Sequence, residues 1–171
     1  MRKKLPWRQR SEVYIIKGKT LVVGKPKAWH GYIIPGGGID KGETPIEAAQ
    51  REALEEIGVN VKNLKFISTL KIEYTKPVKQ IKGKMGRYIE QLYKNWQGAE
   101  FHTYIGKFDG YNTSKWGQEI DSYNTLEVPF EKVSNFFKKE ANKMEKTTDI
   151  YNYEKMKYVY KILTKIRLGL I

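Results

Sequence analysis

A helical repeat of apolar residues marks the last part of the chain. These positions recur every three to four residues, which places them on one side of a helix. The recurring residues are Met156, Val159, Tyr160, Leu163 and Ile166. The pattern predicts a helix over about 150–168 whose apolar stripe faces a core.

Runs of β-branched and aromatic residues predict strands in the first part of the chain. Residues 12–16 and 20–23 indicate a hairpin, because two apolar runs flank the turn residues 17–19. Residues 31–34 predict a short strand that ends at Pro35, where three glycines follow.

Further strands and another helix are predicted in the second half. Residues 64–74 and 101–108 are rich in strand-forming residues. Alternate residues of the first segment share one side, namely Phe66, Ser68, Leu70, Ile72 and Tyr74. Residues 126–130 predict a short strand that runs into a helix ending near residue 142.

The order of these elements indicates the fold class. Strands and helices are mixed without strict β-α-β alternation, which favours an α/β (α+β) fold. The chain has 171 residues and is 40% hydrophobic, which is ample for one packed core. No linker or repeat divides it, so we expect a single domain over residues 1–171.

The composition narrows the classes of partner and of chemistry. Lys and Arg number 32 against 19 Asp and Glu, a formal net charge of +13. This charge favours nucleotides, nucleic acids or anionic surfaces as partners, although solubility is an equally simple reason for it. The absence of Cys excludes disulfides and thiolate catalysis. No apolar run is long enough to cross a membrane and no signal peptide is visible, so we expect a cytoplasmic protein.

Both ends of a helix over 45–57 are encoded locally. Thr44 is a favourable N-cap, and Glu47 completes a capping box with it. Pro45 falls at the first helical position, where its missing N–H costs nothing. Gly58 stands where a left-handed residue ends a helix.

The side chains of this helix divide into two predicted faces. The apolar face, expected to pack against a sheet, comprises Ile46, Ala49, Ala53 and Ile57. The carboxylates Glu52, Glu55 and Glu56 are expected together on the exposed side. Like charges at this spacing repel, and Arg51 alone, paired with Glu55, does not balance them. Clustered carboxylates are preferred ligands of Mg²⁺ or Mn²⁺, so the pattern predicts a metal site.

The same residues resemble the Nudix box, G-x5-E-x7-R-E-U-x-E-E-x-G-U with U a bulky aliphatic residue, the signature of the Nudix (MutT-like) hydrolases. The matching residues are Gly37, Glu43, Arg51, Glu52, Glu55, Glu56, Gly58 and Val59. The departure is Ala53, where the family usually has Ile, Leu or Val, which concerns packing rather than chemistry. The resemblance covers most of the chain and implies an α/β/α sandwich around a mixed β-sheet.

The resemblance also implies an activity and roles for named residues. Nudix enzymes hydrolyse a pyrophosphate in a nucleoside diphosphate linked to another group X, with Mg²⁺ or Mn²⁺. By analogy the metal ligands are Glu52, Glu55, Glu56 and the carbonyl of Gly36, and one of these glutamates or a later acid would serve as the catalytic base. Arg51 would orient the glutamates, and the backbone of Gly37 and Gly38 would contact phosphate.

Several family members supply one more acid from a later loop. The segment Trp116-Gly-Gln-Glu119 is similar to that loop, so Glu119 is the predicted further metal ligand and catalytic acid or base. Asp109 and Asp121 are the alternatives for this role.

Aromatic residues and a basic segment are the candidates for substrate contacts. Trp29 and Trp116 are the predicted stacking residues, with Tyr32 and Tyr74 as further candidates. Asn152 either caps the last helix or contacts a base. Residues 71–94 are rich in Lys and Arg, which favours either a solvated loop or contact with phosphate or RNA. Residues 87–96 are compatible with helix or strand.

Three functions stay open at this stage. The first, which we favour, is hydrolysis of a small nucleotide such as a (d)NTP, a dinucleoside polyphosphate or a nucleotide sugar. The second is removal of a cap or pyrophosphate from RNA 5′ ends, although residues 34–37 lack the Gln of the Pro-Gln-Gly-Gly variant seen in bacterial RNA pyrophosphohydrolases. The third is a catalytically silent nucleotide-binding module, against which the intact glutamates argue.

Overall fold

The structure is a computed structural model that describes residues 5–27, 30–74, 83–112, 123–145 and 150–171. Strands come first and the two longest helices last. The elements in chain order are β1 (Trp7–Lys17), β2 (Thr20–Pro26), β3 (Gly36–Gly38), α1 (Pro45–Ile57), β4 (Val59–Glu73), α2 (Gly83–Asn95), β5 (Gly98–Tyr111), β6 (Tyr123–Pro129), α3 (Phe130–Met144) and α4 (Ile150–Arg167).

The described strands form one mixed sheet with the order β4-β5-β1-β2-β6. β1 runs parallel to β5, and the other paired strands are antiparallel. β3 pairs with the first half of β1, where Arg10, Ser11 and Glu12 lie opposite Gly38, Gly37 and Gly36. The three glycines therefore lie beside the central strand of the sheet.

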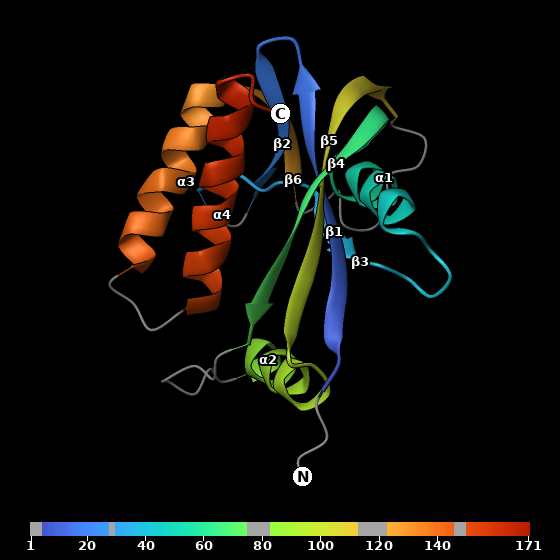
Figure 1. Ribbon diagram of the computed structural model, residues 1–171, viewed down its shortest axis with the longest axis vertical. Coiled ribbons are helices and arrows are strands. Elements are labelled where there is room, and N and C mark those ends of the chain that lie inside the picture. Colours follow the sequence, from blue (N-terminus) through green and yellow to red (C-terminus); the bar gives the residue numbers. More distant parts are fainter. Residues whose placement is uncertain (1–4, 28–29, 75–82, 113–122, 146–149) are drawn as a thin grey trace.

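Helices cover both faces of this sheet (Figure 1). α1 packs on one face, where Ala49, Ala53 and Ile57 join Val13 and Ile15 of β1 in a buried core. α3 and α4 lie side by side on the opposite face. The alternation of β1 side chains supplies both cores, because successive residues point to opposite faces. The expected fold class, an α/β/α sandwich around a mixed sheet, is confirmed.

Most of the predicted elements occur where the hydrophobic pattern placed them. The hairpin of β1 and β2 turns at Gly18, whose φ of 57° is in the left-handed region that favours glycine. The predicted strand and helix at 126–142 correspond to β6 and α3. In α4, Val159 and Leu163 are fully buried, as the apolar stripe predicted.

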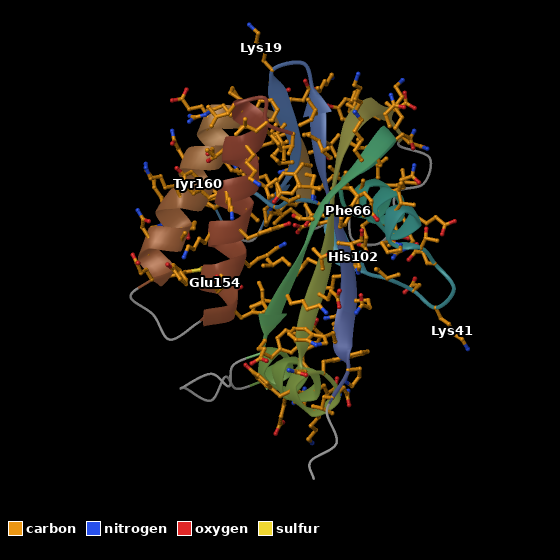
Figure 2. All side chains as sticks on the ribbon, viewed as in Figure 1. Lys19, Lys41, Phe66, His102, Glu154 and Tyr160 are labelled. Carbon is orange, nitrogen blue, oxygen red and sulfur yellow. The ribbon has the colours of Figure 1, made fainter. Side chains whose placement is uncertain are left out.

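Two strand predictions were wrong in detail. Residues 31–34 do not form a strand, since Ile33 makes only an isolated bridge to Gly24, and the glycines that follow form β3 instead. In β4 the expected alternation fails because a register irregularity falls between Phe66 and Ser68. Phe66 consequently packs on Tyr104, on the α1 side of the sheet (Figure 2), whereas Ser68 bonds to Tyr158 of α4.

The segment left open between helix and strand is helical, because α2 spans Gly83–Asn95 and closes one end of the sheet (Figure 1). Its neighbours 75–82 lie outside the described residues. None of the helices in the described part of the chain has the length and apolar character needed to cross a membrane.

Candidate functional site

The helix α1 begins and ends at the residues that the sequence indicated. The Thr44 hydroxyl accepts a hydrogen bond of 3.3 Å from the Glu47 N–H, and the Glu47 carboxylate accepts one of 2.8 Å from the Thr44 N–H. Gly58 ends the helix with φ 63° and ψ 36°. These caps satisfy backbone groups that would otherwise lack partners. The carboxylates of α1 are thereby held on a helix with defined ends.

The predicted faces of α1 are partly wrong. Ala49, Ala53 and Ile57 are buried as expected, but Ile46 is 38% exposed. Glu52 and Glu56 are not on the exposed side, since each is only 8% exposed. At 100° per residue Glu56 lies beside Ala49 rather than opposite it, so both carboxylates turn toward β3.

Arg51 is the centre of a network of ion pairs. Its Nε and Nη2 atoms donate to the two carboxylate oxygens of Glu43 at 2.9 and 3.0 Å. Its Nη1 donates to Glu52 Oε1 and to Glu55 Oε2, each at 2.9 Å. Nη2 also donates to the Gly38 carbonyl at 2.8 Å. One guanidinium therefore joins α1 to the loop after β3 and offsets the repulsion between its carboxylates.

The glycines of β3 leave room for these carboxylates. A Cβ atom on Gly37 would overlap the carboxylate of Glu52, and one on Gly36 would lie 2.5 Å from the Ser11 carbonyl oxygen. The Gly36 N–H donates a hydrogen bond of 2.9 Å to Glu56 Oε2. A side chain at Gly37 would thus displace Glu52, so the close approach of strand and helix requires glycine here.

Two carboxylates of the Arg51 network have pKa values shifted in opposite directions. Burial raises the pKa of Glu52, and the charge and hydrogen bond of Arg51 oppose that rise. The hydrogen bonds from Arg51 lower the pKa of Glu43 instead. Glu52 is therefore a buried carboxylate whose negative charge is incompletely compensated by its protein neighbours.

The donors present here fit a divalent cation. The side chains of Glu52, Glu55 and Glu56 offer only carboxylate oxygens, the hard ligands that Mg²⁺ and Mn²⁺ prefer. A cation would also offset the burial of Glu52. Within the ranges that the structure describes, no three Asp, Glu or His side chains converge as a complete ligand set. A cation shared by these carboxylates would therefore involve some change in their side-chain rotamers.

Several predicted site residues fall outside the described ranges, namely Trp29, Trp116, Glu119 and Asp121. Their roles stay predictions. Asp109, the other alternative to Glu119, is described and forms an ion pair with Lys62 at the far end of β5.

The described aromatic candidates have identified neighbours. Tyr32 packs edge-on against Phe136 of α3, with ring centroids 5.3 Å apart, in a surface groove of about 530 Å³ on the α3 side. That groove lacks the α1 carboxylates among its lining residues, so we assign no catalytic role to it. Tyr74 packs against Tyr151 of α4 at 5.2 Å. Asn152 lies inside α4 rather than before it, so it is not the residue that precedes the helix.

The basic segment 71–94 is only partly described. Lys71 forms an ion pair of 3.2 Å with Glu100 and lies 5.5 Å from the Trp7 ring, so it belongs to the sheet edge. Arg87 and Lys94 are exposed on α2. The interpretation as a phosphate- or RNA-contacting segment therefore depends on α2 and on residues outside the described ranges.

Some groups near β3 escaped the sequence analysis. Arg10 donates to the Gly36 carbonyl at 3.3 Å, and Glu12 is buried in an ion pair with Lys155 of α4. Thr103 donates to the same Glu12 carboxylate at 3.1 Å. Arg10 and Glu12 have one signal in the sequence, which is charge at alternate positions of a strand whose second half is apolar.

Comparison with known proteins identifies the family. A family model described as the NUDIX domain matches residues 7–149. The 8-oxo-dGTP diphosphatase of Buchnera aphidicola subsp. Acyrthosiphon pisum is 34% identical over 102 residues, which cover 57% of this chain and 71% of that protein. An RNA pyrophosphohydrolase of Mesorhizobium japonicum is 33% identical over 115 residues, 59% of this chain and 64% of its own length, just under two thirds.

The fold agrees with this assignment. A NUDIX hydrolase from Nitrosomonas europaea superposes with a TM-score of 0.56 at 11% identity, covering 90% of this chain and 89% of that one. At such identity the likeness concerns the fold alone, whereas the family model and the Buchnera relative match the sequence itself. The chain therefore belongs to the Nudix hydrolases, a family of enzymes that act on pyrophosphate bonds.

Proposed function

We propose that the chain hydrolyses the pyrophosphate linkage of a nucleoside diphosphate linked to a group X, releasing a nucleoside monophosphate. The observation that carries the proposal is the Arg51 network, which holds Glu43, Glu52 and Glu55 against the glycine strand β3 while Gly36 holds Glu56. The matching family model over 7–149 and the single sheet also support one Nudix domain over residues 1–171.

The proposed ligands of the cation are Glu52, Glu55 and Glu56 with the Gly36 carbonyl, and the proposed ion is Mg²⁺ or Mn²⁺. When bound, such an ion neutralises phosphate oxygens and lowers the pKa of coordinated water. Glu119 is proposed as a further ligand and as the acid or base, and this proposal comes from the sequence alone.

The chain's own groups would orient the substrate. Arg51 keeps Glu52 and Glu55 directed toward β3, and it contacts the end of β3 through the Gly38 carbonyl. Close approach to the backbone at Gly37 and Gly38 would let N–H groups contact phosphate oxygens. Trp29 and Trp116 are the proposed stacking partners of the base.

A small nucleotide is the favoured substrate, and RNA 5′ ends are the second candidate. The first is supported by the Buchnera relative, which is named for 8-oxo-dGTP, and the second by the Mesorhizobium relative, which is named for RNA. The exposed cations of α2, Arg87 and Lys94, favour the second candidate as a site of RNA contact.

A substrate panel tests the proposal. Purified protein with Mg²⁺ or Mn²⁺ is incubated with dGTP, 8-oxo-dGTP, a diadenosine polyphosphate, ADP-ribose, triphosphorylated RNA and capped RNA, and the products are separated by ion-exchange chromatography. We expect a nucleoside monophosphate or a monophosphorylated RNA end from at least one substrate, and no product in EDTA. Binding without cleavage across the panel would instead support the catalytically silent module.

A further inference from the structure

Among the described residues, Arg10 of β1 has a buried hydrogen-bond donor without an acceptor, which is rare for arginine. Its Nε atom is buried and has no hydrogen-bond partner among the described residues. Its Nη2 atom makes only a long hydrogen bond, 3.3 Å, to the Gly36 carbonyl. Guanidinium donors in folded proteins normally find acceptors, so an unpaired buried Nε indicates an acceptor that the described residues do not supply.

Arg10 lies between the glutamates of α1 and the aromatic side chains near α4. The Gly36 residue that accepts from Arg10 donates its own N–H to Glu56, so a single residue separates the two side chains. On the other side the guanidinium is 5.6 Å from the Phe101 ring.

The local charge balance is positive. Arg8 and Arg10 occupy alternate positions of β1 and therefore point to the same face of the sheet. Glu12, the next residue on that face, is paired with Lys155. Arg8 donates at 2.9 Å to the hydroxyl of Tyr88, a neutral partner. In the described part of the chain, neither arginine has an ion-pair partner within 4.0 Å.

We propose that Arg10, assisted by Arg8, binds a phosphate group that lies beyond the scissile pyrophosphate, so that the preferred substrate carries a 5′-triphosphate. This inference rests on the proposed function and names its substrate class. A guanidinium fork binds a phosphate through two parallel N–H···O hydrogen bonds, and Nε is one of the two donors that such a fork uses. A nucleotide sugar such as ADP-ribose has a neutral ribose in place of the third phosphate and leaves Nε without an acceptor.

The catalytic test compares Arg10→Gln with Arg10→Lys, and uses Arg167→Gln as the control, since Arg167 is exposed at the end of α4. We expect kcat/KM for dGTP to fall about 10- to 100-fold in Arg10→Gln, with a change below about threefold for ADP-ribose. Arg10→Lys should recover only part of the loss, because Lys lacks the fork. Circular dichroism melting confirms that each variant is folded. An equal loss on both substrates, or no loss on either, would overturn the proposal.

An assay of triphosphorylated RNA beside dGTP shows whether the triphosphate of the substrate belongs to an RNA 5′ end or to a free nucleotide. A loss with Arg10→Gln on whichever of the two the wild type cleaves supports the assignment. If the wild type prefers ADP-ribose to both, the inference is wrong although the proposed function stands.

A binding measurement separates the inference from catalysis. In EDTA, calorimetric titration with inorganic tripolyphosphate and with pyrophosphate should show tighter binding of tripolyphosphate by the wild type, about tenfold, and loss of that preference in Arg10→Gln. A preference that persists in Arg10→Gln, or is absent from the wild type, overturns the role of Arg10. A wild type that shows the Arg10-dependent preference but cleaves no nucleotide contradicts the proposed function instead.

Discussion

The backbone N–H of Gly36 donates a hydrogen bond of 2.9 Å to Oε2 of Glu56, so a strand of three glycines holds a carboxylate of the neighbouring helix. A backbone donor is fixed by the sheet and has no rotamers, which makes it a precise support for a side chain. The Glu56 carboxylate is consequently held beside β3 when no ligand is bound.

Glu56→Gln tests whether this oriented carboxylate is needed for catalysis. An amide keeps the shape and can still accept from Gly36, but it lacks the negative charge that a cation ligand needs. We expect kcat to fall at least about 100-fold, with the melting temperature within about 3 °C of the wild type. Turnover equal to that of the wild type would remove Glu56 from the proposed site.

A pair of glycine substitutions tests the close contact between β3 and α1. A Cβ on Gly37 would overlap Glu52, whereas the nearest atom to a Cβ on Gly38 is Nη2 of Arg8 at 4.0 Å. Gly37→Ala should therefore lower kcat by more than about tenfold, whereas Gly38→Ala, which leaves Glu52 in place, should raise KM and change kcat little. Steady-state kinetics on one substrate measure both, and similar losses in the two variants would argue against the contact.

The pairing of Glu43 with Arg51 predicts a pH dependence of stability. The hydrogen bonds from Arg51 hold the pKa of Glu43 below its usual range in the folded chain. A lowered pKa stabilises the fold above the unfolded-state pKa, and this contribution is lost as the pH falls through the folded-state pKa. Glu43→Gln should thus be less stable than the wild type above about pH 5, with the difference shrinking at lower pH.

Urea denaturation between pH 3 and 7 measures this difference in the free energy of unfolding. Glu154→Gln, on α4 (Figure 2), is the control. A difference for Glu43→Gln that does not depend on pH would contradict the assigned role of the Arg51 ion pair.

The buried ion pair of Glu12 and Lys155 predicts unequal costs of single and double substitution. Burial lowers the pKa of Lys155, and Glu12 opposes that shift. Lys155→Met leaves a buried carboxylate without its cation and should cost about 3–5 kcal/mol of unfolding free energy. Combining it with Glu12→Gln should restore much of this stability. A double variant whose loss equals the sum of the single losses would show that the two groups are not coupled.

Local rules account for what could be predicted from the sequence. The ends of α1 depend on Thr44, Glu47 and Gly58, which act on backbone groups within five residues of themselves. The apolar stripe of α4 likewise depends on spacing alone, and it was confirmed at Val159 and Leu163. The spacing of the box also identified Arg51 and its glutamates as one cluster before their contacts were known.

Long-range pairing accounts for what could not be predicted. The register of β3 against β1 determines that the three glycines form a strand. It also determines that Glu52 and Glu56 turn toward that strand. The contact of Glu12 with Lys155 joins residues 143 positions apart. The division of α1 into two opposite faces was also too coarse. It placed Glu56 opposite Ala49, whereas the two side chains lie on the same side of the helix.

Binding of Mn²⁺ is the most direct test of the central proposal, that the carboxylates of α1 hold a divalent cation. Electron paramagnetic resonance counts the Mn²⁺ ions that remain free during a titration of the wild type and of the Glu52→Gln/Glu56→Gln variant. We predict saturable binding to the wild type that weakens by at least about tenfold in the variant. Equal Mn²⁺ affinity in the two proteins would contradict the proposal.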